Sequence, residues 1–173
     1  MERDAMAPTG EIPMNPGDLP IDAIVLEESG VYDGVFKRAT VSPKPNKSGF
    51  VFCALQLQVS EGDFEGITVM MNHLPLPVTA DSLADADGVS TPTRKHTIQA
   101  HNHNVSFGRF ALAFKIKDAA KAPKVDLRDP DSIGRWQEWI SQYYNNRGKF
   151  TVHNQEFPEG SGRLRSGVND FMF

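Results

Sequence analysis

The segment from Phe50 to Val59 constrains the fold of this chain more than any other part of the sequence. Apolar residues occupy every second position, which is the period of a β-strand with one face on a core. The apolar set is Val51, Cys53, Leu55, Leu57 and Val59. The alternate face carries Phe50, Phe52, Ala54, Gln56 and Gln58. We therefore predict a strand whose first set is buried and whose second set faces outward.

Neighbouring segments show the same period of two. Residues 30–41 alternate up to a turn rich in Pro and Lys, and residues 66–73 alternate after a turn at 61–63. In the later segment, Ile67, Val69 and Met71 match the core face. These two strands and the strand between them are expected to form a meander.

The middle of the chain changes character twice. Residues 74–103 contain three prolines and no sustained period, so we expect an irregular connection there. Helical spacing then predicts one helix over about 105–118 and a second that begins near 131 and stops at 145–148. Their apolar stripes are expected to form one side of a helical layer, through residues that include Phe107, Phe110, Phe114, Trp136, Trp139 and Ile140.

Strand patterns return at 149–155 and 163–173. Five strands with a helical insert between the third and the fourth have the connectivity of an OB-fold, a small Greek-key barrel. We therefore predict a mainly β protein with an α insert, a five-stranded OB-fold-like barrel with a helical layer over 105–146. A single domain is expected over 26–173, preceded by a flexible, acidic, proline-rich arm over 1–25.

Charge is distributed unevenly along the chain. Its net charge is −4 at pH 7, but residues 1–30 hold seven acids and one base, a net of −6, which leaves +2 on the other 143 residues. A mildly basic body leaves nucleic acid open as a partner. One cysteine excludes an intramolecular disulfide framework, and no apolar run has the length of a membrane span. We expect a soluble, cytoplasmic protein.

Several short patterns resemble a family of small phage-encoded, OB-fold-like proteins to which single-stranded-DNA binding is ascribed. The patterns are Gly30-Val31-Tyr32, Lys47-Ser48-Gly49, the turn over 61–66, and the segments 148–152 and 168–171. The resemblance covers about residues 29–73 and 105–173. It implies a role in phage replication or recombination, protein partners from phage or host replication and recombination, and a location in the host-cell cytoplasm.

OB barrels bind single strands on the outer face of strands two and three, flanked by the loops that join strands one to two and four to five. Sequence-tolerant binding needs cations for the phosphates and aromatic rings for the bases. We predict a nucleic-acid site formed by Lys37, Lys44, Lys47, Phe50, Phe52, Lys149, Arg163 and Arg165. Two alternatives stay open: the phenylalanines pack under the insert or on a second subunit, and the cations are ordinary solvated charges.

No pattern in the sequence predicts catalysis, a metal or another cofactor. His96, His101 and His103 lack the spacing of a zinc site, and Cys53 falls on the core face of its strand. We therefore expect a non-enzymatic protein that binds single-stranded DNA without a cofactor, and homo-oligomerisation stays open. The alternative is an OB-like interaction or assembly module, an accessory subunit of a nucleoprotein complex without nucleic-acid affinity of its own.

Overall fold

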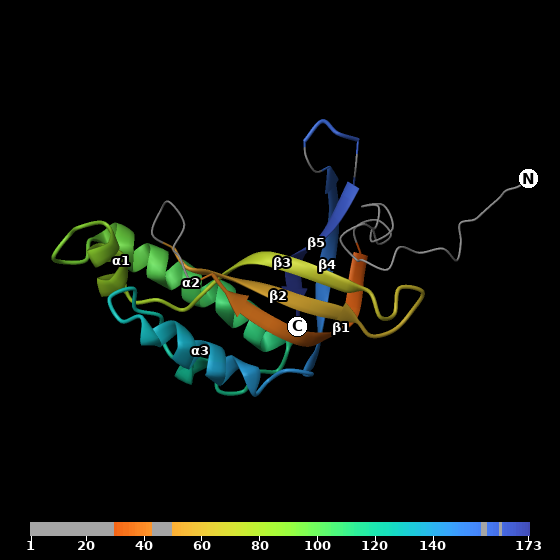
Figure 1. Ribbon diagram of the computed structural model, residues 1–173, viewed down its shortest axis with the longest axis horizontal. Coiled ribbons are helices and arrows are strands. Elements are labelled where there is room, and N and C mark those ends of the chain that lie inside the picture. Colours follow the sequence, from red (N-terminus) through yellow and green to blue (C-terminus); the bar gives the residue numbers. More distant parts are fainter. Residues whose placement is uncertain (1–29, 43–49, 157–158, 163) are drawn as a thin grey trace, which may run out of the picture.

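Five antiparallel strands form one sheet that curls into a nearly closed barrel (Figure 1). The computed structural model describes residues 30–42, 50–156, 159–162 and 164–173. The strands are β1 (Gly30–Val41), β2 (Phe52–Val59), β3 (Thr68–Pro75), β4 (Arg147–Glu156) and β5 (Leu164–Met172). Their hydrogen-bonded order is β3-β2-β1-β4-β5. The two edge strands approach each other, since a Cβ on Gly167 of β5 would lie 3.9 Å from the carbonyl oxygen of Met70 in β3.

The helices lie between β3 and β4 in the chain. They are α1 (Ala80–Ala86), α2 (Arg94–Ala113) and α3 (Asp131–Ser141), with a 3-10 turn, η4 (Ala119–Lys121), between the last two. A mainly β barrel with this insert is consistent with an OB-like fold, and the predicted fold class is confirmed. Within the described ranges, no helix combines the length and apolar character needed to cross a membrane.

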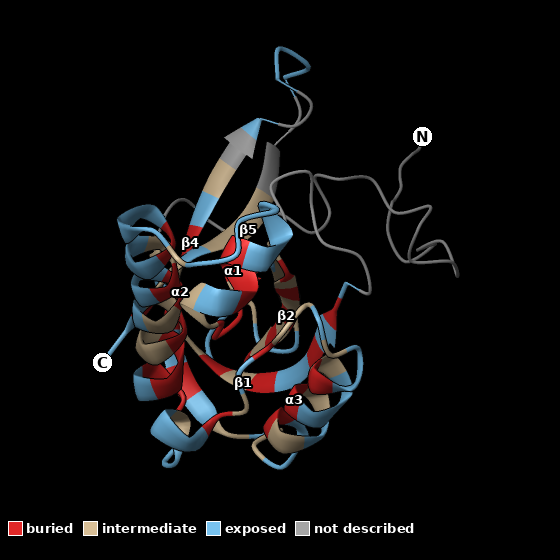
Figure 2. Cartoon of the chain, turned by 90° about the vertical axis from the view of Figure 1, so that its left-hand side faces the viewer, coloured by how far each residue is buried: buried red, intermediate tan, exposed pale blue. Residues whose placement is uncertain are grey.

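The barrel interior holds the apolar set predicted on the second strand. Val51, Cys53, Leu55, Leu57 and Val59 are all buried. The predicted helical stripes also enter the core, and their buried members are Phe107, Phe110, Phe114, Trp136 and Ile140. Figure 2 shows the buried sides of α2 and α3 turned toward the strands. The sheet and the helical layer therefore share one hydrophobic core.

A bulge in β1 reverses the alternation of that strand. The β1–β2 register shifts between Phe36 and Arg38, so one extra residue, Lys37, separates the two inward-facing runs. Phe36 and Ala39 are both fully buried, whereas Lys37 and Arg38 are exposed. The bulge thus turns Arg38 to the outer face.

A second register shift lies between Cys53 and Leu55, opposite the end of β3. This shift places Leu74 in the core. The period of two set by Ile67, Val69 and Met71 predicts instead that odd-numbered residues face inward along the whole strand. Of the predicted inward set on β3, Val69 is buried, whereas Ile67 and Met71 are half-buried. The period of two therefore predicts which side chains face the core better at the start of β3 than at its end.

The prediction of an irregular connection over 74–103 is wrong for most of that segment, because α1 and the first half of α2 lie within it. Neither stretch has a strong apolar period, but caps start both helices. Thr79 Oγ1 accepts a hydrogen bond from the Ser82 N–H at 3.1 Å, and the Thr93 N–H donates to His96 Nδ1 at 3.0 Å. The predicted helix over 105–118 is the second half of α2, which ends at Ala113.

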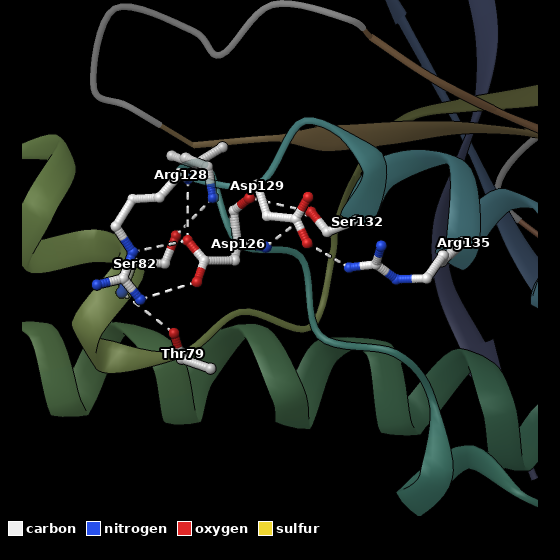
Figure 3. A network of polar contacts seen from close by, with 8 residues as sticks. Thr79, Ser82, Asp126, Arg128, Asp129, Ser132 and Arg135 are labelled. Atoms are coloured by element: carbon white, nitrogen blue, oxygen red, sulfur yellow. Dashed lines mark hydrogen bonds and ion pairs between the residues drawn. The ribbon is translucent and has the colours of Figure 1, made fainter.

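Polar contacts around Asp126 join α1 to α3 (Figure 3). Ser82 Oγ accepts from the Leu127 N–H at 2.9 Å, and Ser132 Oγ donates to the Asp126 carbonyl oxygen at 3.0 Å. Arg128 binds the Asp126 carboxylate through two hydrogen bonds of 2.9 and 2.8 Å, and this pairing lowers the pKa of Asp126 to about 2. The buried hydroxyls of Ser82 and Ser132 are both bonded to backbone groups. We therefore interpret this network as a contact that stabilises the helical layer and not as a reactive site.

Candidate nucleic-acid interface

The outer face of β1, β2 and β3 corresponds to the surface on which OB-folds bind single strands. Alternation places Phe52, Ala54, Gln56 and Gln58 of β2 on this face, all of them half-buried. Gln56 pairs with Arg38 of β1 on one side and with Met70 of β3 on the other. A row of one cationic, one amide and one thioether side chain therefore crosses the face.

Four rings gather where β2 begins and β3 ends, and we call Phe50, Phe52, His73 and His103 the aromatic cluster. The centroids of Phe50 and Phe52 are 6.3 Å apart, with an interplanar angle of 65°. Phe52 lies 5.8 Å from His73 in an edge-to-face arrangement and 6.1 Å from His103. These separations fall in the range of attractive contacts between aromatic rings.

The two phenylalanines have different surroundings. Phe50 packs against the hydrophobic core, and its ring centroid is 5.0 Å from that of His103 on α2. It also borders a polar cleft of about 270 Å³ together with Leu83 of α1 and Lys95 of α2. Phe50 thus lies against the helical insert, which was one of the alternatives left open by the sequence. Phe52, half-buried on the strand face, is the better candidate for a stacking platform.

His103 contributes an uncharged ring to the aromatic cluster. Its side chain is buried, and Nδ1 lies 3.3 Å from the Leu76 carbonyl oxygen, so Nδ1 carries a proton and donates. Burial lowers the pKa of His103 below its ordinary value, although the bond to Leu76 opposes that shift. At neutral pH the imidazole is therefore neutral and contacts Phe50 and Phe52 as an aromatic surface.

The described cations among the predicted site residues lie away from the aromatic cluster. Lys37 sits in the β1 bulge, donates to Asn145 Oδ1 at 3.3 Å and lies beside Leu57, on the order of 16 Å along β2 from Phe52. Lys149 of β4 forms an ion pair of 2.6 Å with Asp33, level with the far end of β2. The structure therefore brings Phe50 and Phe52 together but places neither lysine beside them.

The remaining predicted cations fall on the two loops expected to flank the site. Lys44, Lys47 and Arg163 lie outside the described residues. Arg165 pairs with Gln155 through the β4–β5 ladder, and its side chain is outside the described part. Because Lys47 is three residues from Phe50, chain connectivity alone keeps their Cα atoms within about 11 Å of each other.

Sequence reasoning missed Arg38 and His73 as members of this surface. The signal for Arg38 was available: two consecutive basic residues precede Ala39 and Val41, which marks a break in the alternation of the strand. No comparable signal marks His73, because the register shift near the end of β3 decides which way that segment faces.

His96 and Cys53 lie in buried positions that favour a structural role over a chemical one. His96 is buried between Thr93 and Asp87, and its Nε2 lies 2.7 Å from Asp87 Oδ2. This hydrogen bond is the main cause of the lowered pKa of Asp87. Burial raises the pKa of the Cys53 thiol to about 12, so the thiolate is scarce at neutral pH. Among the described residues, no three His, Cys, Asp or Glu side chains are grouped so that they could hold a metal ion.

Fold and surface together define the class of this protein as an OB-fold-like barrel with an aromatic cluster where β2 begins and β3 ends. No protein-family model matches the sequence, and no curated protein matches it. The resemblance to phage-encoded proteins therefore remains a prediction from short sequence patterns.

Proposed function

We propose that this protein is a non-enzymatic, phage-type protein of replication or recombination that binds single-stranded DNA on the outer face of β1–β3. The observation that carries the proposal is the aromatic cluster, which presents the half-buried ring of Phe52 on that face. Every base has a π-face, so stacking on such a ring tolerates any sequence.

The surface supports a simple division of roles. A base stacks on Phe52, whose edge contact with His73 holds its ring in place. Gln56 is the strand neighbour of Arg38. In the proposed complex, the Gln56 side chain forms hydrogen bonds with base edges and Arg38 faces a phosphate. A face with so few cations depends on the loop lysines Lys44 and Lys47 for further charge, so binding should be moderate and sensitive to salt.

A fluorescence-anisotropy titration with a single strand, a duplex and an RNA of equal length tests the proposal. The unaltered protein should bind the single strand more tightly than the duplex, and Phe52→Ala should weaken single-strand binding about fivefold to 150-fold. Phe64→Ala is the matched control, because Phe64 is also half-buried but lies in the turn between β2 and β3. If the unaltered protein binds no single strand at low salt, or if both variants bind equally well, the proposal fails.

One observation favours the second candidate, a protein-interaction module without nucleic-acid affinity. Ile98, Val105 and Leu112 are exposed on α2 at intervals of seven residues, so they form one apolar stripe along the helix. The sequence of α2 contains no acid and carries Arg94, Lys95 and Arg109. Such a face suits an acidic amphipathic partner. Failure to bind any single strand, together with loss of partner binding in Val105→Glu, would favour this candidate.

A further inference from the structure

A groove of about 580 Å³ lies at the junction of α2, β1, β4 and β5. We call it the α2–β4 groove, and its main lining residues are Asp33, Leu112, Lys115, Arg147, Lys149 and Phe173. Gly34 and Gly148, which pair across β1 and β4, also line it. The groove is level with the end of β2, whereas the aromatic cluster lies at the start of that strand.

Apolar side chains converge on this groove. Seven large apolar residues are exposed in the described part of the chain, and three of them line the groove: Leu112, Met172 and Phe173. Phe173 is 72% exposed and Leu112 is 62% exposed. Exposed apolar groups that gather in one hollow mark an interaction site more often than scattered ones do.

The charge of the groove is positive. Lys115, Arg147 and Lys149 line it, and Asp33 is the only acid among its described lining residues. Asp33 is already bound to Lys149 at 2.6 Å, whereas Lys115 and Arg147 form no ion pair with any other described residue. An apolar surface beside two unpaired cations is complementary to a segment that combines apolar residues with acids.

The chain itself carries such a segment. Residues 19–26 contain six apolar residues, and the flanking acids are Asp18, Glu27 and Glu28, with Asp22 inside the run. The segment leads directly into Gly30, the first residue of β1, and Asp33 at the groove follows three residues later, about 10 Å along the strand. Eleven residues can span up to about 35 Å, so the segment can reach the groove, and the covalent link gives it a high effective concentration there.

A second copy of the chain is a poorer occupant if the grooves face each other. Symmetric pairing of two α2–β4 grooves would bring Lys115 and Arg147 of one copy toward the same cations of the other, which is unfavourable. The acidic segment meets the same cations with the opposite charge.

We propose that residues 18–29 dock into the α2–β4 groove of their own chain. The apolar residues of 19–26 cover Leu112, Met172 and Phe173, and the flanking carboxylates face Lys115 and Arg147. Docking would also place acids near Lys149, a residue of the predicted nucleic-acid site. The inference does not depend on DNA binding, because the groove and the segment are complementary in the protein alone.

Paramagnetic relaxation enhancement in the full-length chain tests the proposal. A nitroxide attached to Ala23→Cys labels only that position, because Cys53 is fully buried. Amide signals of 112–115, 147–149 and 172–173 should lose more than about half of their intensity, whereas those of α1 should be unaffected. Raising the salt from about 0.05 M to about 0.5 M should restore much of the lost intensity, because screening weakens the ionic contacts.

Two sets of variants separate the charged contacts from the apolar ones. Lys115→Glu with Arg147→Glu should abolish the broadening, and adding Asp18→Lys, Glu27→Lys and Glu28→Lys should restore it. Leu112→Ser with Phe173→Ser should abolish it without reversing any charge. All four groove residues are exposed, so these variants should fold.

Two outcomes would overturn the proposal. One is broadening that is absent from the groove or equally strong on α1. The other is equal broadening in a mixture of isotope-labelled chains without nitroxide and unlabelled chains with nitroxide, which would show docking between chains.

Discussion

Burial gives different roles to neighbouring residues of the same type. Phe50 lies two residues before the start of β2, and Phe52 is the first residue of that strand. Phe50 packs against the core and the helical insert, whereas Phe52 contacts other rings at the surface. Removing the two rings should therefore affect different properties of the protein.

We expect Phe50→Ala to lower the melting temperature clearly, with a loss approaching the range of about 3–5 kcal/mol found for buried phenylalanines. Phe52→Ala should lower it less and should weaken single-strand binding more. Thermal unfolding and anisotropy titrations on the two variants check this. Similar losses of stability in both variants, with unchanged binding, would make both rings core residues and favour the interaction module.

His103 should make the stability of the protein depend on pH. Its folded-state pKa is lowered by burial, so the unfolded chain binds a proton more readily. The free energy of unfolding should therefore fall as the pH drops below about 6.5, the ordinary histidine pKa, and level off below the lowered pKa. Urea titrations between neutral and mildly acidic pH measure this slope. His103→Gln should reduce the slope, whereas His101→Gln, at an exposed position of the same helix, should leave it unchanged.

At the scale of elements, α2 and β4 meet without space for a side chain between them. A Cβ on Gly148 of β4 would lie 2.5 Å from the carbonyl oxygen of Ala113, the last residue of α2. This backbone contact holds the end of the helix against the barrel and helps to shape the α2–β4 groove.

Gly148→Ala should lower the free energy of unfolding by about 1–3 kcal/mol or more, because backbone atoms must move to admit the methyl group. Gly134→Ala is the matched control, since nothing lies within 4 Å of the position that its methyl group would take in α3, and it should stabilise the helix by about 0.5–1 kcal/mol. Denaturant unfolding of both variants gives the two values. Equal stability would show that α2 does not approach β4 so closely.

At the scale of the whole molecule, charge divides the chain into an acidic segment and a mildly basic body. Residues 1–30 carry a net charge of −6, and the rest carries +2. An attached polyanion competes with DNA phosphates for the same cations, and salt weakens this competition.

Deleting residues 1–25 should leave a folded protein that binds single strands more tightly at low salt. The gain should shrink as salt is added, because screening already suppresses the competition in the full chain. The control is to replace the acids of residues 1–25 with their amides, and this change should reproduce most of the gain in single-strand affinity. If the truncated protein is unfolded, residues 1–25 are part of the fold. If its affinity for single strands is unchanged, residues 1–25 have no role in binding.

The sequence alone determined the strands, the barrel connectivity and most of the core, because these follow from local periods. The alternation over 50–59 sets which side of β2 is buried, and the stripe with Trp136 and Ile140 sets the inner face of α3. Turns between successive strands then make β1, β2 and β3 neighbours and pair β4 with β5, whereas the pairing of β1 with β4 joins strands that the helical insert separates in the chain.

Only the tertiary structure decided the direction of His73, the helical state of 80–86 and 94–103, and the surroundings of the two phenylalanines. Each depends on contacts between segments far apart in the chain. The backbone of Phe36 bonds with Asn145 and Asn146 beside the β1 bulge, and His103 on α2 bonds with Leu76. Such contacts leave no period in the sequence, because the partners that satisfy a buried polar group are brought together only when the chain folds.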